Sequence, residues 1–301
     1  MRTEMNENRN MNESKYIVSA DKVWELAQQI RKNRPIVHCI TNAVTVNDCA
    51  NILLAVGASP TMAHHPLEVE EITAGAAALV CNFGATCDYE AMLTAGKKAR
   101  VLEHPIVVDP VGVSGSGYRR GLCLEFLEKI HPTCIRGNYS EIRALMENHS
   151  TVTGVDAAVT ELGVSGTGQD TAAEEAKRQQ FFEQMKEFAR HHKVILIASG
   201  AVDLITDGNT HYQVYNGHSD MARITGSGCM SSVMLGAFFS QEKSVQGAVA
   251  SCGWMGIAGE LAAERTREVC GGTMTFREKF IDAVSLMEHE KLERLHVHLD
   301  M

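Results

Sequence analysis

Short apolar runs alternate with helix-period segments along most of this chain, and the alternation restricts its fold more than any other feature. The runs are rich in branched side chains and are free of polar interruptions, which is typical of parallel strands covered on both faces. The segments between them are long enough for helices that cross back over the sheet. We therefore predict an α/β fold with a mostly parallel central sheet and helices on both faces.

The boundaries of the predicted elements follow from these patterns. The predicted strands are Pro35–Ile40, Ala77–Phe83, Pro105–Asp109, Thr133–Arg136 and Lys193–Ala198. The predicted helices are Asn47–Val56, Asp88–Glu103, Arg119–Ile130, Ser140–Glu147 and Thr171–His192. A hairpin is predicted from Val202–Thr206 and His211–Tyr215, which flank an Asp-Gly-Asn-Thr turn. From Gly228 to Met287 the chain reads as wholly helical.

No Pro- or Ser-rich linker and no internal repeat divides the sequence. We therefore expect a polar tail over residues 1–18, followed by a single domain over residues 19–301. The stretch 148–180 is dense in Thr, Ala, Gly and acidic residues. We expect it to form a surface excursion.

Composition narrows the function classes. The 301 residues are 45% hydrophobic and carry a formal net charge of -9, spread along the chain, so binding to nucleic acid or to an anionic membrane is not expected. Met1–Ser14 is polar and does not read as a signal peptide. The nine cysteines lack CxxC spacing and lie mostly in apolar runs. Buried, reduced thiols in a cytoplasmic protein are the simplest interpretation.

A glycine-rich string, Ile224–Met230, leads from the predicted hairpin into a helix. Glycines at 226 and 228 allow a sharp turn that aims consecutive backbone N–H groups at one point, and a helix N-terminus there favours an anion. Cys229 would lie in the first turn, where thiol pKa values fall. The string equally suits an ordinary glycine turn followed by a buried cysteine, and both interpretations stay open at this point.

Two further polar groups follow predicted strands. Asp109 ends one strand and precedes Pro110, so its carboxylate can either hold Mg²⁺ or cap the turn. After the next strand, Arg136 can donate a pair of hydrogen bonds to a phosphate. Asn138 and Glu141, three residues apart at a helix start, can share one ion, form a capping box, or do both.

The joint occurrence of these groups at the ends of strands is stronger evidence for a functional site than each group is alone. A glycine-lined anion site, two carboxylates for Mg²⁺ and an arginine for phosphates are the components of phosphoryl transfer. No GxxxxGK[ST], HRD or DFG string is present, which excludes the P-loop and protein-kinase types. The ribokinase-like small-molecule kinases are the remaining type that fits.

Two N-terminal strings resemble the signature of the hydroxyethylthiazole kinase family. They are His38–Asn51 (HCITNAVTVNDCAN) and Gly57–Met62 (GASPTM), and the Asp109, Arg136–Glu141 and Gly226–Cys229 elements follow in the family's order. The similarity covers about residues 20–290. It implies a ribokinase-like fold and ATP-dependent phosphorylation of the hydroxyl of 4-methyl-5-(2-hydroxyethyl)thiazole, a reaction of thiamine biosynthesis.

The resemblance also implies roles for individual residues. The substrate-binding residues would be Asn42, Val44, Met62 and Gly226. The ATP-binding residues would be Arg136, Asn138, Ser199 and Gly228, and Mg²⁺ would be held by Asp109 and Glu141. Cys229 occupies the position at which most ribokinase-like kinases have an aspartate base. Because a thiol is a weak base at neutral pH, we expect a modest catalytic role for Cys229.

Family members are trimers with active sites between subunits, which implies a homotrimer in which Met62 completes a neighbour's site. The implied partners are therefore ATP, a small thiazole alcohol and further copies of the chain. Some features depart from the family's pattern: Ser199 where Thr is commoner, a loosened Gly271–Phe276 segment, no Thr in Asn82–Ala85, and the length of the 148–180 stretch.

Other functions fit parts of the sequence. A hydroxymethylpyrimidine kinase or an ADP-dependent hydrate dehydratase would share the fold, although the Asn42–Asn51 motif and Cys229 argue against both. A hydrolase with Cys229 as its nucleophile, or a binding protein without turnover, are alternatives from other classes. The histidines at 64, 65, 191, 192, 296 and 298 have no partner at ligand spacing, and we expect them to be solvated or to lie in turns.

Overall fold

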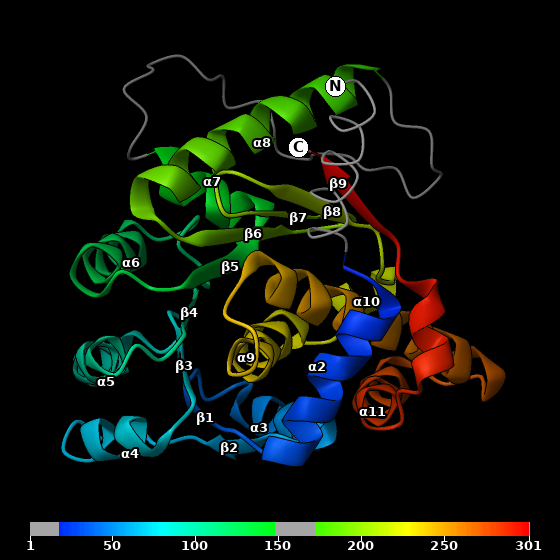
Figure 1. Ribbon diagram of the computed structural model, residues 1–301, viewed down its shortest axis with the longest axis horizontal. Helices are drawn as coiled ribbons and strands as arrows, with labels where there is room; N and C mark the ends of the chain where they lie inside the picture. Colours follow the sequence, from blue (N-terminus) through cyan, green and yellow to red (C-terminus); the bar gives the residue numbers. More distant parts are fainter. Residues whose placement is uncertain (1–17, 148–171, 301) are drawn as a thin grey trace, which may run out of the picture.

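A nine-stranded sheet forms the centre of the computed structural model, which describes residues 18–147 and 172–300 (Figure 1). The strand order is β2-β1-β3-β4-β5-β6-β7-β8-β9. The strands from β2 to β6 in this order are parallel, whereas β7, β8 and β9 are added antiparallel. The predicted α/β class with a mostly parallel sheet is confirmed.

The elements have the following bounds. The strands are β1 Ile36–Ile40, β2 Ser59–Thr61, β3 Ala78–Asn82, β4 Ile106–Asp109, β5 Cys134–Asn138, β6 Ile195–Ser199, β7 Asp203–Thr206, β8 His211–Val214 and β9 Val297–Asp300. The α-helices are α2 Ala20–Asn33, α3 Val46–Val56, α4 Val69–Gly75, α5 Tyr89–Val101, α6 Gly117–Ile130, α7 Tyr139–Glu147, α8 Ala172–His192, α9 Ser227–Phe239, α10 Val245–Glu268 and α11 Thr273–Ser285. Short 3-10 helices are η1 Thr86–Asp88, η2 Ser219–Arg223 and η3 His289–Arg294.

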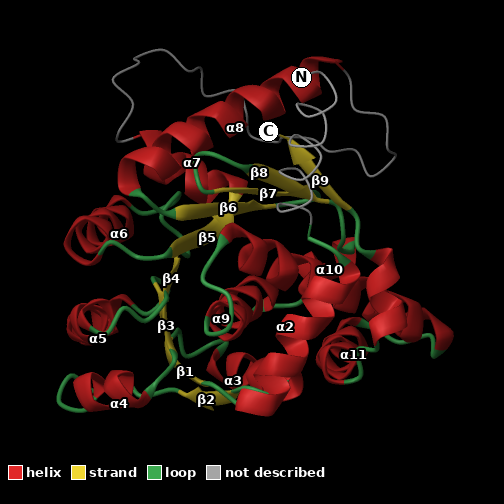
Figure 2. Cartoon of the chain, in the orientation of Figure 1, coloured by secondary structure: helices red, strands yellow, loops and turns green. Residues whose placement is uncertain are grey.

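Helices cover both faces of the sheet (Figures 1 and 2). Helices α2, α3, α9, α10 and α11 share one hydrophobic core with one face, and α5, α6, α7 and α8 share a second core with the other. Strands β3 and β4 are buried along their whole length because both faces are covered. This explains why they appear in the sequence as uninterrupted apolar runs.

Helix starts agree with local capping chemistry. The Ser19 and Ser244 hydroxyls accept the backbone N–H groups of Lys22 and Gly247, at 3.2 and 3.4 Å, and so satisfy donors that α2 and α10 cannot satisfy internally. The predicted elements are found within two residues of their expected bounds, the hairpin of β7 and β8 included. The region 228–287 is helical as predicted, as α9, α10 and α11 with short breaks.

Several elements were not predicted. The helices α2 and α4 and the strands β2 and β9 are absent from the sequence-based assignment. Strands β2 and β9 are three and four residues long, and each pairs with a single neighbour at an end of the sheet. Such short edge strands exist because a neighbouring strand offers hydrogen bonds, which a local pattern does not reveal.

Two predicted surface segments lie partly outside the described residues. Of the expected tail, 1–17 lie outside them, and Val18 is buried in the core rather than exposed. Of the expected excursion, 148–171 lie outside them, whereas 172–180 belong to the start of α8, in which residues 175–180 are largely exposed. No helix within 18–147 and 172–300 combines the length and apolar character needed to cross a membrane.

Helix α9 lies unusually close to the sheet because of one glycine. A Cβ added at Gly236 would lie 2.8 Å from a methyl carbon of Val80 and 2.9 Å from one of Val37. Both are stiff β-branched side chains on strands, so neither can move aside easily. The close approach of α9 to β1 and β3 therefore requires a residue without a side chain at this position.

We expect Gly236→Ala to lower the free energy of unfolding by about 1–2 kcal/mol, because overpacking outweighs the gain in helix propensity. Gly121→Ala in α6 is the matched control, since an added Cβ there meets nothing within 4 Å. That variant should gain about 0.5–1 kcal/mol. Urea unfolding of the two variants measures both effects, and equal stabilities would contradict the packing argument.

Candidate active site

Polar side chains gather where the parallel strands end. β3 ends at Asn82 and β4 at Asp109, and the strand register pairs these two residues. In the same way Asn138 of β5 pairs with Ser199 of β6. Open α/β sheets bind their ligands outside this edge. Asp109, Asn138 and Ser199, three of the residues predicted for the site, lie at this edge of the sheet.

The glycine-rich loop that leads into α9 lies at this edge. Gly226 has φ +87°, and a Cβ there would lie 2.9 Å from the methyl carbon of Thr45, so only glycine fits without strain. The Gly228 carbonyl accepts a hydrogen bond from Arg136 Nη1 at 2.9 Å. A Cβ at Gly228 would meet that same nitrogen at 2.9 Å. Arg136 thus connects the end of β5 to the first turn of α9.

The Cys229 thiol is buried in the first turn of α9 and accepts two amide hydrogen bonds. Asn82 Nδ2 donates to Sγ at 3.2 Å and Asn42 Nδ2 at 3.5 Å. Burial and the nearby Asp109 carboxylate nevertheless raise the pKa of Cys229, and hydrogen bonds from Thr45, Asn42 and Asn82 only partly offset this. The expectation that the helix start lowers this pKa was wrong, because it ignored burial and a carboxylate distant in sequence.

Asp109 is the most deeply buried acid of the site, with 2% of its surface exposed. Burial, with a smaller contribution from Glu141, raises its pKa to about 6, while Arg136 and hydrogen bonds from Ser232 and Asn82 oppose the rise. The Asn82 bond to Oδ2 measures 2.9 Å. A carboxylate held in this way gains from a cation placed beside it.

Glu141 completes the capping box that the sequence offered as one interpretation. Its Oε2 accepts the Asn138 N–H and the Asn138 Oδ1 accepts the Glu141 N–H, both at 2.9 Å. Its Oε1 accepts the Gly112 N–H at 2.9 Å, so the carboxylate also connects the loop after β4 to the start of α7. Beside it, the Ser199 hydroxyl donates to the Gly137 carbonyl at 3.1 Å.

The residues predicted to bind substrate separate into two groups. Asn42 and Gly226 lie within the network, and Asn42 Oδ1 also accepts the N–H groups of Val44 and Thr45 at the start of α3. The Val44 side chain, in contrast, exposes 74% of its surface. Met62 follows β2 and is partly buried against the core on the α9 side.

Sequence reasoning missed other contributors to the site. Asn82 joins Asn42, Asp109 and Cys229, whereas in the sequence its segment stands out only by the lack of a threonine. The buried Asp48 in α3 forms an ion pair with the partly exposed Arg277 in α11, close to Gly226. Asn82 could have been found by the rule that found Asp109, since each is a polar residue ending a buried strand.

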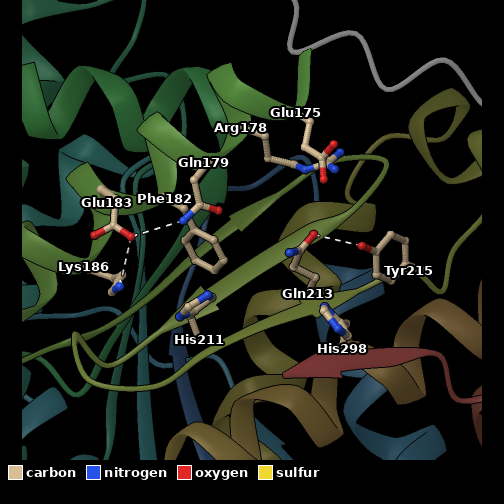
Figure 3. A pocket seen from close by; sticks show the side chains of 10 residues that line it. All are labelled: Glu175, Arg178, Gln179, Phe182, Glu183, Lys186, His211, Gln213, Tyr215 and His298. Carbon is tan, nitrogen blue, oxygen red and sulfur yellow. Dashed lines mark hydrogen bonds and ion pairs between the residues drawn. The ribbon is translucent and has the colours of Figure 1, made fainter. Parts of the chain in front are cut away.

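A groove of about 490 Å³ lies elsewhere, between α8 and strands β8 and β9 (Figure 3). Its lining is mostly polar or charged and includes none of the residues predicted for the site; it consists of Glu175, Arg178, Gln179, Phe182, Glu183, Lys186, His211, Gln213, Tyr215 and His298. Several of these side chains bond one another, such as Lys186 with Glu183 at 3.0 Å.

Over the described ranges, no three or more His, Cys, Asp or Glu side chains form a cluster that could hold a metal ion. Asp109 and Glu141 nevertheless form an electrostatically coupled pair of carboxylates at the strand edge. Magnesium is commonly held by one or two carboxylates together with substrate phosphates. The residues present fit that arrangement.

Comparison with known proteins gives the family. The model of the hydroxyethylthiazole kinase family matches residues 27–290. A hydroxyethylthiazole kinase from Clostridium acetobutylicum is 40% identical over 273 residues, which cover 89% of this chain and 96% of the relative. The chain belongs to the hydroxyethylthiazole kinase family.

Solved structures agree with that assignment. The hydroxyethylthiazole kinase protein from Pyrococcus horikoshii OT3 is 30% identical, with a TM-score of 0.78 over 93% of this chain and 99% of that one. A ribokinase-like superfamily protein from Enterococcus faecalis V583 is 12% identical, with a TM-score of 0.53 over 87% of this chain and 89% of that one. The second likeness concerns the fold alone and confirms the predicted ribokinase-like architecture.

We expect Asp109→Asn to stabilise the ligand-free protein at neutral pH. Because burial raises the pKa of Asp109 to about 6, the free energy of unfolding of the unaltered protein should fall as pH rises from about 4 to about 6 and stay low above that. The variant lacks this loss, worth on the order of 2–3 kcal/mol. Melting temperatures in EDTA from pH 5 to pH 8 test this, with the exposed Asp282→Asn as control. A constant difference across pH would contradict it.

Proposed function

We propose that this protein transfers the γ-phosphoryl group of ATP to the hydroxyl of 4-methyl-5-(2-hydroxyethyl)thiazole, in thiamine biosynthesis. The observation that carries the proposal is the meeting of the Gly226–Cys229 loop with Asp109 at the carboxyl edge of the sheet, in a chain of this family. The relatives' name gives the acceptor alcohol. The arrangement of anion-binding loop, carboxylates and arginine supports the reaction class.

Each group at the site would have its own role in the reaction. The alcohol oxygen attacks the γ-phosphorus in line, and the loose transition state depends on positioning more than on a strong base. Backbone N–H groups at the start of α9 would stabilise charge on the transferred oxygens. Arg136, already held by the Gly228 carbonyl, and Ser199 and Asn138 at the ends of β6 and β5 would contact the nucleotide.

Asp109 and Glu141 would hold Mg²⁺ together with the phosphates. Bound there, the ion would neutralise charge on the phosphoryl oxygens. Glu141 would do so from a carboxylate whose orientation is fixed by the N–H groups of Gly112 and Asn138. Asp109 would gain the positive partner that its buried position favours.

We further propose a cytoplasmic homotrimer whose sites lie between subunits, with Asn42, Val44, Met62 and Gly226 contacting the thiazole. Support comes from β2, which is the edge strand of the sheet. Apolar side chains near it are exposed in the single chain: Val44, Leu54 and Leu67. A neighbouring subunit that covered this edge would bury them and bring Met62 toward a second site.

The decisive test is incubation of the purified protein with Mg-ATP and the thiazole alcohol, with ADP release and phosphorylated product followed by mass spectrometry. We expect stoichiometric thiazole phosphate, absent without Mg²⁺. An Arg136→Met variant should lose most of the activity, which excludes a contaminating kinase. Phosphorylation of hydroxymethylpyrimidine instead would overturn the substrate, and no phosphorylation of any alcohol would overturn the function.

We expect Cys229→Ala to reduce kcat by no more than the roughly 10²–10⁴-fold that a general base contributes. The thiol is a weak base because burial and Asp109 raise its pKa, so little thiolate is present at neutral pH. Steady-state kinetics at saturating ATP measure the loss, with Cys123→Ala, buried on the α6 side, as a matched thiol control. A larger loss would assign the thiol an indispensable role.

A further inference from the structure

Asn82 forms hydrogen bonds with four neighbours in the site. It is the last residue of β3, and only 1% of its surface is exposed. Its Nδ2 donates to Asp109 Oδ2 at 2.9 Å and to Cys229 Sγ at 3.2 Å. Its Oδ1 accepts the Gly84 N–H at 2.9 Å and Asn42 Nδ2 at 3.2 Å. All of the side chain's polar capacity is thereby directed to neighbours of the reacting centre.

The direction of this amide is fixed by the backbone. The Gly84 N–H can only donate, so the Asn82 atom 2.9 Å from it is the carbonyl oxygen. The amide nitrogen must then face the carboxylate and the thiol. Gly84 itself cannot carry a side chain here, since a Cβ would lie 2.7 Å from Asn82 Oδ1. The β3 end and its following turn therefore present one NH₂ group in one orientation.

That NH₂ group lies between two groups that can each carry negative charge. Two such groups buried together repel, and Asp109 is indeed one of the causes that raise the pKa of Cys229. One N–H on each group offsets this repulsion and fixes the distance between them. Asn42, the second amide on the thiol, is farther from it, at 3.5 Å.

We propose that Asn82 is a positioning residue for phosphoryl transfer, which holds the Cys229 thiol and the Asp109 carboxylate in register by donating one N–H to each. The proposal rests on the proposed function, since the thiol belongs to the acceptor side of the site and the carboxylate to the nucleotide side. Asn82 touches neither substrate in this role. Its effect falls on the chemical step, because small misplacements of reacting groups cost far more there than in binding.

Asn82→Asp separates this role from simple packing. The shape is kept, and the carboxylate oxygens still accept from Gly84 and Asn42. The bond to Asp109 is replaced by repulsion between two carboxylates, and the Cys229 sulfur loses its closer amide donor. We expect kcat to fall at least 30-fold, while KM for the thiazole alcohol stays within threefold. A collapsed pocket would raise KM as well, and that result would overturn the proposal.

A double-mutant cycle tests whether Asn82 acts through the thiol. If it does, the kcat losses of Asn82→Asp and Cys229→Ala do not multiply, and the double variant should lose less than one third of their product. Losses that multiply would overturn the proposal. Thr206→Val is the control for stability, since it removes two hydrogen bonds in the β7–β8 turn, one of them buried. It should leave kcat within twofold.

Alkylation of Cys229 tests the geometry without reference to the kinase activity. In the ligand-free protein at pH 8, iodoacetamide should label Cys229 at least five times more slowly in Asn82→Asp, because the sulfur loses its donor and gains a negative neighbour. The exposed Cys87 and Cys270 serve as internal references. An unchanged Cys229 rate would overturn the proposal, whatever the enzyme phosphorylates.

The measurements separate the two proposals. If the unaltered protein phosphorylates no thiazole but Cys229 labelling slows as expected, the proposed function fails and the positioning by Asn82 stands. If Asn82→Asp does not fold, Asn82→Ser replaces it, because one hydroxyl can donate to only one of the two groups. That variant should lower kcat at least fivefold with an unchanged KM; a normal kcat would overturn the positioning role.

Discussion

The parallel pairing of β3 with β4 sets Asn82 beside Asp109, and the remainder of the candidate site is arranged around that pair. Both residues end strands whose apolar residues are buried on both faces, so neither can shift without disturbing two cores. The thiol of Cys229 then meets this pair from α9. A register slip of one residue would turn every side chain of the strand to the opposite face, and the contacts among these three residues would be lost.

Burial gives the site its electrostatic character. Asp109 and Cys229 are both withdrawn from water, and the pKa of each is raised. The uncharged forms are thereby favoured in the ligand-free protein, and hydrogen bonds from Asn82 and Arg136's charge only partly offset the cost. A bound cation would supply the charge partner that Asp109 lacks. Without ligands, the site is therefore less stable than an apolar core of the same shape would be. The groups that serve the function lower the stability of the fold.

Helix α9 and the loop before it lie close to neighbouring elements because two glycines leave room for the approach. Gly226 adopts a left-handed conformation against Thr45, and Gly236 lets the helix lie on Val37 and Val80. A larger residue at either position would require the loop or the helix to move, since an added Cβ would lie within 3 Å of a neighbouring side chain. The partly buried ion pair of Asp48 with Arg277 adds a second support, because it joins α3 to α11 beside the same loop.

The sequence by itself determined the elements and which polar residues end them. Apolar runs marked the buried strands, and the Asn138–Glu141 spacing predicted the capping box, because these features depend on neighbours in the chain. The short strands β2 and β9 could not be predicted, since a partner strand creates them. Only the tertiary structure decided that Asn82 meets Cys229, 147 positions away, and that the pKa of that thiol rises. The fold brings these distant residues into contact and excludes water from the thiol. A local sequence pattern reveals neither effect.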